Sequence, residues 1–138
     1  MKTRTGYSGK PLYQKLGIKE DYKVLFYNEP EAYYQWLEIP FQPTKVSGED
    51  LADMMHIFAK DKEKLREYLI NGISQIQQNG MIWVSWPKKT SKVETNITED
   101  IIREIAFPLG LVDIKVCSVS NVWSGLKIVI RKENRRIV

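Results

Sequence analysis

The sequence predicts an α/β protein, a three-layer αβα sandwich whose mostly parallel sheet ends in an antiparallel hairpin. Short apolar segments rich in aromatic and β-branched residues alternate with segments of helical periodicity as far as residue 110. Two segments of period two then close the chain without a helix between them. Strands that alternate with helices pair in parallel through right-handed crossovers, so the first segments predict the parallel part and the last two predict the hairpin.

The first third of the chain predicts two short helices and two strands, the second of them very short. A helical turn is expected at residues 11–16, where a proline begins and a glycine follows the apolar pattern. The run YKVLFYN at residues 22–28 is the first expected strand. Residues 31–37 follow a proline and can form a helix of about two turns. A short strand is expected near Lys45.

The middle of the chain contains the longest predicted helix. The apolar run DMMHIFA at residues 53–59 is the next expected strand, and Asp61 is a suitable N-cap for a helix over residues 62–78. Leucine, tyrosine and isoleucine recur there at helical spacing. Asn79 and Gly80 should stop this helix and begin a strand at residues 81–86.

The last third predicts one helix and the hairpin. Asn96 or Thr98 can cap the helix, two acids suit its first turn, and Pro108 ends it. Residues 112–118 and 126–131 alternate with period two, and the segment between them contains asparagine, serine and glycine. This combination is typical of a β-hairpin.

The composition predicts a single soluble domain over residues 1–138, with an irregular lead at 1–10 and a basic tail at 132–138. Hydrophobic residues make up 43% and charged residues 28% of the chain, as in ordinary globular proteins. No secretory signal or membrane-spanning run is expected. The single cysteine favours a reducing, cytoplasmic compartment.

The titratable residues point to no catalytic centre and no metal site. His56 is the only histidine and stands in an apolar strand, so it is expected to be a hydrogen-bonded residue of the core or of a sheet edge. Cys117 lies in a predicted strand and is expected to be a small buried hydrophobe. The net charge of +4 is spread over both ends, which predicts at most weak, non-specific binding of nucleic acid.

The predicted sheet resembles the class I S-adenosylmethionine-dependent methyltransferase fold in a shortened form. The resemblance places YKVLFYN as its first strand, DMMHIFA as its fourth and GMIWVSW as its fifth. That family follows its first strand with a glycine-rich loop, whereas this chain has Asn28, Glu29, Pro30 and Glu31. Because a proline and two acids replace the permissive backbone, we expect no cofactor to bind.

Four motifs also resemble a bacterial family of small proteins of unknown function. They are YSGKPLYQKLGI at residues 7–18, WVSWPKK at 83–89, TEDIIREIAFPLGLVDIKVC at 98–117 and WSGLKIVIRK at 123–132. This resemblance implies the fold and the cytoplasmic setting, and it transfers no catalytic residue.

A candidate ligand site follows from the direction of the predicted strands. In open parallel sheets, ligands bind outside the carboxyl ends of the strands. Ser85, Lys88 and Lys89 leave the sheet from that edge, and Asn28 and Glu29 leave the first strand there. These five residues could hold an anionic small molecule. The competing interpretation of the lysines is a solvated loop after a core strand.

Three functions stay open at this point. The leading hypothesis is a non-catalytic binding or interaction module, with a small anion or another protein as its partner. The alternative is an enzyme or enzyme relic that binds a nucleotide-like or other anionic ligand at the carboxyl edge. Non-specific nucleic-acid binding is the weaker third hypothesis. An enzyme requires a concave pocket in which titratable groups converge, whereas a module predicts an exposed apolar patch.

Overall fold

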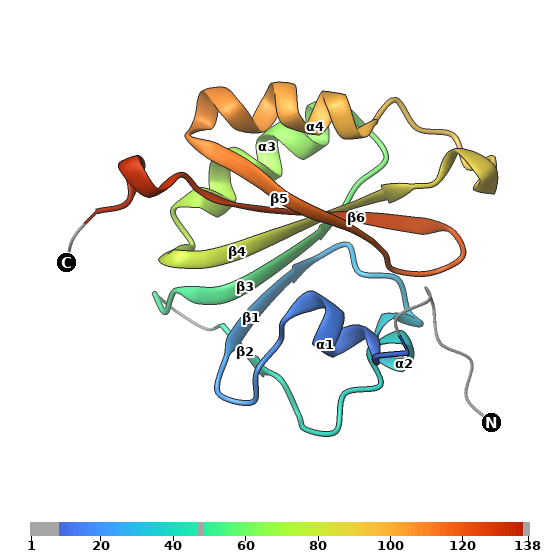
Figure 1. Cartoon of the computed structure of the whole chain (residues 1–138), viewed down its shortest axis with the longest axis horizontal. Coiled ribbons are helices and arrows are strands. Elements are labelled where there is room, and N and C mark those ends of the chain that lie inside the picture. The colour runs from blue at the N-terminus through green and yellow to red at the C-terminus, as the bar shows by residue number, and fades with distance from the viewer. Residues whose placement is uncertain (1–8, 47–48, 137–138) are drawn as a thin grey trace.

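A computed structural model describes residues 9–46 and 49–136 and contains a six-stranded sheet between two layers of helices (Figure 1). The strand order is β2-β1-β3-β4-β6-β5. The first four pair in parallel, and β6 runs antiparallel to both β4 and β5. The predicted three-layer α/β fold with a parallel sheet and a terminal hairpin is confirmed. The strands are β1 (Lys23–Tyr27), β2 (Thr44–Lys45), β3 (Ala52–Phe58), β4 (Ile76–Pro87), β5 (Leu111–Ser118) and β6 (Trp123–Ile130).

Helices cover the two faces of the sheet unequally (Figure 1). The longer helices α3 and α4 lie on one face, and the five-residue helices α1 and α2 lie on the other. The helices are α1 (Leu12–Leu16), α2 (Tyr33–Leu37), α3 (Lys62–Ile73) and α4 (Glu99–Ala106), with 3-10 turns η1 (Lys89–Ser91), η2 (Phe107–Leu109) and η3 (Lys132–Asn134). The basic tail predicted at residues 132–138 begins with the turn η3. Most of the irregular lead predicted at residues 1–10 lies outside the described residues.

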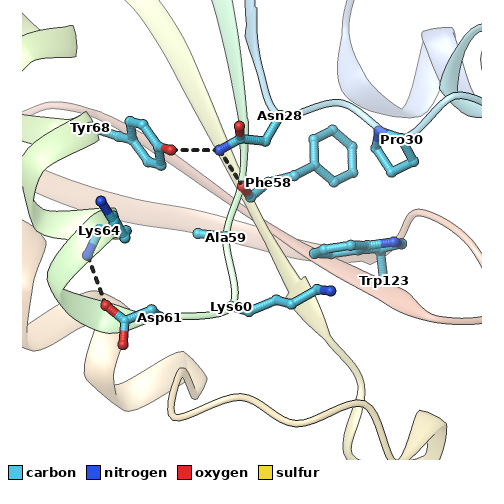
Figure 2. Close-up of a pocket in the computed structure, with 9 residues that line it drawn as sticks. All are labelled: Asn28, Pro30, Phe58, Ala59, Lys60, Asp61, Lys64, Tyr68 and Trp123. Atoms are coloured by element: carbon cyan, nitrogen blue, oxygen red, sulfur yellow. Dashed lines mark hydrogen bonds between the residues drawn. The ribbon is translucent and has the colours of Figure 1, made fainter.

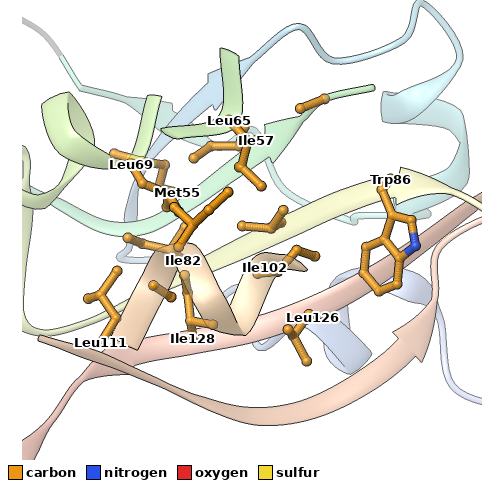
Figure 3. Close-up of a cluster of buried hydrophobic side chains, with 14 of the residues drawn as sticks. Met55, Ile57, Leu65, Leu69, Ile82, Trp86, Ile102, Leu111, Leu126 and Ile128 are labelled. Atoms are coloured by element: carbon orange, nitrogen blue, oxygen red, sulfur yellow. The ribbon is translucent and has the colours of Figure 1, made fainter. Parts of the chain in front are cut away.

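The larger core lies between the sheet and the pair α3 and α4 (Figure 3). Leu65 and Leu69 of α3 and Ile102 of α4 are completely buried against it. Trp86 of β4 packs in the same cluster. Each such side chain contributes roughly 1.5 to 3 kcal/mol on leaving water, so this face carries much of the stability of the fold.

The second core lies beneath α1 and α2. Trp83 is completely buried there, and its indole N–H donates to the carbonyl oxygen of Leu16 over 2.9 Å. Trp83 and Trp86 thus occupy opposite faces of β4, as strand alternation predicts. The hydrogen bond ties the C-terminal end of α1 to the middle of the sheet.

Two predicted N-caps are present. The Asp61 carboxylate accepts from the backbone N–H groups of Glu63 and Lys64, each over 3.1 Å, at the start of α3. The hydroxyl of Thr98 accepts from the backbone N–H of Ile101 at the start of α4. Both contacts satisfy donors that the first helical turn leaves without a partner.

The predicted end of α3 and the predicted start of β4 were wrong. The helix ends at Ile73, and Ile76 already pairs with Ala52 of β3. Asn79 and Gly80 lie within β4, in an irregular stretch before Met81, which pairs with Met54 of β3. Pairing with β3 therefore overrides the helical spacing of the isoleucines. Strand β6 likewise begins earlier than predicted, at residue 123.

The order of the strands creates a crevice at one edge of the sheet. The connection after β1 runs through α2 on one face, and the connection after β3 runs through α3 on the other. Adjacent parallel strands whose helices lie on opposite faces leave a gap outside their carboxyl ends.

Among the described residues, no helix combines the length and apolar character that crossing a membrane requires.

Candidate functional site

A cavity of about 490 Å³ lies outside the carboxyl ends of β1 and β3 (Figure 2). We call it the crevice. Its lining comes from the ends of both strands, the start of α3 and the start of β6. The lining residues are Asn28, Pro30, Phe58, Ala59, Lys60, Asp61, Lys64, Tyr68 and Trp123.

Aromatic rings form the apolar wall of the crevice. Phe58 is the last residue of β3, and its ring meets that of Trp123 edge-on, with centroids 5.1 Å apart. The Phe58 ring also stacks on His56, with a centroid distance of 4.3 Å. Pro30 closes the wall beside these rings (Figure 2). These two ring contacts hold Phe58 in place in the wall.

A hydrogen-bonded asparagine bridges the back of the crevice. The Asn28 amide donates to the hydroxyl of Tyr68 over 2.7 Å and to the carbonyl oxygen of Phe58 over 3.3 Å (Figure 2). Asn28 has a φ of 60°, a left-handed conformation that asparagine tolerates better than most residues. The Tyr68 ring stacks on that of Tyr27, with centroids 5.3 Å apart. These contacts link the first turn after β1 to both β3 and α3.

Two lysines and one aspartate form the charged rim. Lys60, Asp61 and Lys64 are all exposed and line the crevice near the start of α3. The Asp61 carboxylate is held by backbone N–H groups and by the side chain of Asn96, over 3.3 Å. The hydrogen bond from the Lys64 N–H, above all, lowers the pKa of Asp61. Asp61 is therefore a capping carboxylate, and the two ammonium groups give the rim a net positive charge.

A buried polar chain stands behind the aromatic wall. His56 Nδ1 lies 2.7 Å from the hydroxyl oxygen of Tyr33, and its Nε2 lies 2.7 Å from that of Ser85. All three residues are completely buried. Burial lowers the pKa of His56 to about 3, and it raises the pKa of Tyr33 well above its usual value. The expectation of a hydrogen-bonded core histidine is confirmed.

Of the five residues predicted for the ligand site, one lines the crevice. Asn28 lies in it, whereas Ser85 faces His56 inside the core. The hydroxyl of Tyr34 donates to Glu29 over 3.2 Å. Lys88 donates to the hydroxyl of Ser118 over 2.7 Å, and Lys89 is exposed in η1. The structure thus distributes these residues over the edge and does not gather them in one cavity.

Sequence reasoning missed most of the lining. Phe58 and Ala59 end a predicted strand, and Lys60 and Asp61 directly follow it, so their position in the sequence already indicated the carboxyl edge. The prediction used the lysines after β4 instead. Tyr68 lies on the helix that follows, two turns from its start. Trp123 comes from the beginning of β6, and no local pattern places it beside Phe58.

The other reactive residues lie elsewhere. Cys117 of β5 is half-buried, and burial, partly offset by three lysines, raises the pKa of its thiol. Within residues 9–46 and 49–136, no three histidine, cysteine or acidic side chains are grouped so that they could hold a metal ion.

Residues 45–132 match the model of a family described as "Protein of unknown function (DUF3052)". The match covers more than half of the chain. The chain belongs to this family. Its membership confirms the resemblance to a family of unknown function that the sequence motifs suggested. No curated protein matches the sequence.

Methyltransferases are among the solved structures with a similar fold. The ribosomal protein L11 methylase of Lactobacillus delbrueckii subsp. bulgaricus is 10% identical with a TM-score of 0.53, over 86% of this chain and 74% of its own. The B. subtilis tRNA methyltransferase TrmK is 12% identical with a TM-score of 0.53, over 86% and 64%. Aeropyrum pernix fibrillarin, solved with natively bound S-adenosyl-L-methionine, is 11% identical with a TM-score of 0.52, over 91% and 71%. This DUF3052 chain therefore has a methyltransferase-like fold.

The loop after β1 does not fit the cofactor that this fold implies. The resemblance calls for a glycine-rich turn at Asn28–Glu31, where the backbone would approach S-adenosylmethionine. Here the Asn28 side chain crosses the back of the crevice to Tyr68, and the Pro30 ring forms part of its wall. The asparagine adopts the left-handed conformation that glycine would favour, but its side chain occupies the space that glycine would leave open.

Proposed function

We propose that this DUF3052 protein is a non-catalytic binding module whose crevice takes a small molecule with a flat apolar body and an anionic group. The observation that carries the proposal is the crevice itself, a formed cavity at the switch point of the sheet with an aromatic wall and a basic rim. Apolar cavities with a few convergent polar groups are the usual form of small-molecule sites.

The aromatic wall suits the flat apolar body of such a ligand, and the basic rim suits its anionic group. The rings of Phe58 and Trp123 offer apolar surface against which a flat group packs. Lys60 and Lys64 stand at the start of α3 and provide donors for an oxyanion. Their long side chains are exposed, and within the described residues neither ammonium group makes a hydrogen bond or a salt bridge, although Lys64 acts on the Asp61 carboxylate as a positive charge.

The chemistry of the lining supports a binding role over catalysis. The nine lining residues include no histidine, cysteine or serine. The Asp61 carboxylate caps α3, and the Tyr68 hydroxyl accepts from Asn28. His56 and Ser85 form a serine–histidine pair, but both are completely buried behind Phe58. The alternative of an enzyme or enzyme relic would need His56 or Ser85 to reach a ligand in the crevice, or Asp61 or Tyr68 to leave its present hydrogen bonds.

Binding of anilinonaphthalene sulfonate, a flat aromatic anion, tests the proposal directly. We expect it to bind the native protein, quench or shift the tryptophan fluorescence, to which Trp123 contributes, and raise the melting temperature. A ligand at 100 times its dissociation constant stabilises the native state by about 2.7 kcal/mol. A parallel thermal-shift panel of nucleotides, S-adenosyl compounds and acyl-CoA would identify the natural class.

Two double variants locate the site. Lys60→Ala with Lys64→Ala should abolish the stabilisation, because it removes the basic rim. Lys88→Ala with Lys89→Ala removes the same charge from residues outside the lining and should leave the response unchanged. If the second variant loses the response and the first keeps it, the ligand site lies on the lysine-rich loop after β4, and the crevice proposal is wrong.

A further inference from the structure

The face of the sheet that carries α1 and α2 is only partly covered. The second core uses residues of β1, β3 and β4, such as Val24, Met54 and Trp83. The register places a further set of side chains on the same face of β5 and β6, and these are half-buried or exposed. We call this set the open face: Val112, Lys115 and Cys117 of β5 with Lys127 and Val129 of β6.

Two lysines stand directly opposite each other in the open face. Lys115 of β5 pairs with Lys127 of β6, and Lys127 in turn pairs with the buried Trp83 of β4. Like charges directly opposite across a pair of strands destabilise a sheet. Partial burial and the charge of Lys115 both lower the pKa of Lys127. The fold therefore maintains a repulsive pair where an apolar or oppositely charged pair would be more stable.

Two further lysines flank this pair at the end of β5. Lys15 of α1 donates to the carbonyl oxygen of Ser118 over 3.2 Å, and Lys88 donates to its hydroxyl over 2.7 Å. Lys15, Lys88 and Lys115 all act on the Cys117 thiol as positive charges. In the part of the chain that the structure describes, no carboxylate lies within ion-pair distance of Lys88, Lys115 or Lys127.

We propose that the open face is a docking surface for an acidic, partly apolar segment of a partner protein. Carboxylates of the segment would neutralise Lys115 and Lys127, and its apolar side chains would cover Val112 and Val129 on the same face. Complementary charge of this kind gives an interface its specificity and speeds association.

The composition of the open face favours a protein over a nucleic acid. Proteins that bind single-stranded nucleic acid stack the bases on aromatic side chains within a basic groove. The open face combines two lysines with valines and a cysteine, and it has no aromatic residue. Only a few phosphates could be neutralised at once on so small a cluster, so the electrostatic contribution to nucleic-acid binding would be small. This inference does not depend on the proposed ligand of the crevice.

A labelled peptide in which pairs of glutamates alternate with pairs of valines is the probe, because in an extended chain this order places both residue types on one face. We expect it to bind the full chain and to shift the backbone amide NMR signals of β5 and β6. Lys115→Glu with Lys127→Glu should weaken its binding by at least about tenfold, because the reversed charges repel the glutamates. Lys62→Glu with Lys132→Glu makes the same change in net charge at exposed residues of α3 and η3 and should leave the affinity nearly unchanged.

The proposal is overturned by several results of the same titrations. These are no binding of the peptide, equal weakening by both double variants, or equal binding of a peptide with glutamine in place of glutamate. Tighter binding of an oligouridylate at β5 and β6 would assign the surface to nucleic acid. A dimer that forms through these strands, seen by sedimentation, would assign it to a second copy. Lys115→Ala with Lys127→Ala, checked by thermal unfolding, gives the same test should the reversed charges impair folding.

Discussion

The imidazole Nε2 of His56 lies 2.7 Å from the hydroxyl oxygen of Ser85, and neither residue has any exposed surface. The opposite nitrogen is equally engaged, by the Tyr33 hydroxyl. Whichever nitrogen carries the proton, one hydroxyl donates to the ring and the other accepts from it. The neutral ring is thus fully satisfied, whereas an added proton would place a second donor and a charge in the core.

Lowering the pH should therefore destabilise the protein through His56. In the folded state His56 has a pKa of about 3 and stays neutral above that pH. In the unfolded chain the same histidine takes up its proton near the ordinary pKa of 6.5. Stability from this group is fully present above 6.5 and is lost as the pH falls towards 3. The loss approaches ~1.4 kcal/mol per pH unit within that window. Urea unfolding at a series of pH values measures it.

The variant His56→Gln separates this effect from the titration of carboxylates. Its stability at neutral pH should be lower, but the difference from the parent should shrink as the pH falls from 6.5. A difference that stays constant over this range would show that His56 is not the titrating group.

Trp86→Ala should cost roughly 3 to 5 kcal/mol of the free energy of unfolding, because the indole packs in the larger core and leaves a cavity. Urea unfolding compared with the parent measures the cost. Ile114→Ala is the control, since Ile114 is 53% exposed and its truncation should matter by less than about 0.5 kcal/mol. A harmless Trp86→Ala would place this tryptophan outside the core.

Gly80→Ala should destabilise the irregular stretch of β4 by about 1 to 3 kcal/mol. A Cβ at this position would lie 3.0 Å from the carbonyl oxygen of Gln77 and 3.1 Å from that of Asp53, and backbone atoms cannot move aside as a flexible side chain can. Thermal unfolding measures the effect. Asn79→Ala, at the exposed neighbouring residue, should be nearly neutral. Equal stability of both variants would mean that the β3–β4 register near Gly80 differs from the one described.

Isothermal titration with S-adenosylmethionine should show no binding. The physical reason is the loop after β1, where the Asn28 side chain and the Pro30 ring take the space of a glycine-rich turn. A methyltransferase titrated in parallel controls for the quality of the ligand. Micromolar affinity would refute the claim that this loop blocks the cofactor, while the fold assignment would stand.

Most of the architecture could be predicted from local patterns because most of these patterns agree with the final pairing of the strands. The capping residues Asp61 and Thr98 and the alternation of Trp83 and Trp86 act over a few residues, so they can be read along the chain. The end of α3 could not be predicted in this way. Ile73 and Ile76 continue a helical stripe, but Ile76 gains more by pairing with Ala52, which lies more than twenty residues away in the sequence.

The crevice was only partly predictable for a related reason. A cavity does lie at the carboxyl edge that the rule indicated, and Asn28 lines it, but its use as a ligand site stays a prediction. Ser85 lies at that edge too, but its side chain pairs with a histidine one strand away. Trp123 reaches the crevice from the hairpin strand inserted next to β4, and only the three-dimensional order of strands brings it beside Phe58.

The five-residue length of α1 and α2 bears on the order in which the protein folds. Isolated helices shorter than about 12 to 15 residues are marginal in water, so these two can persist only while docked. Helix α4 has only eight residues, but it packs with α3 on the larger core, so we expect the sheet with α3 and α4 to assemble first and the layer of α1 and α2 to close over Trp83 last. In native-state hydrogen exchange, the amides of that layer should then open without global unfolding, and the indole proton that Leu16 accepts should exchange together with them.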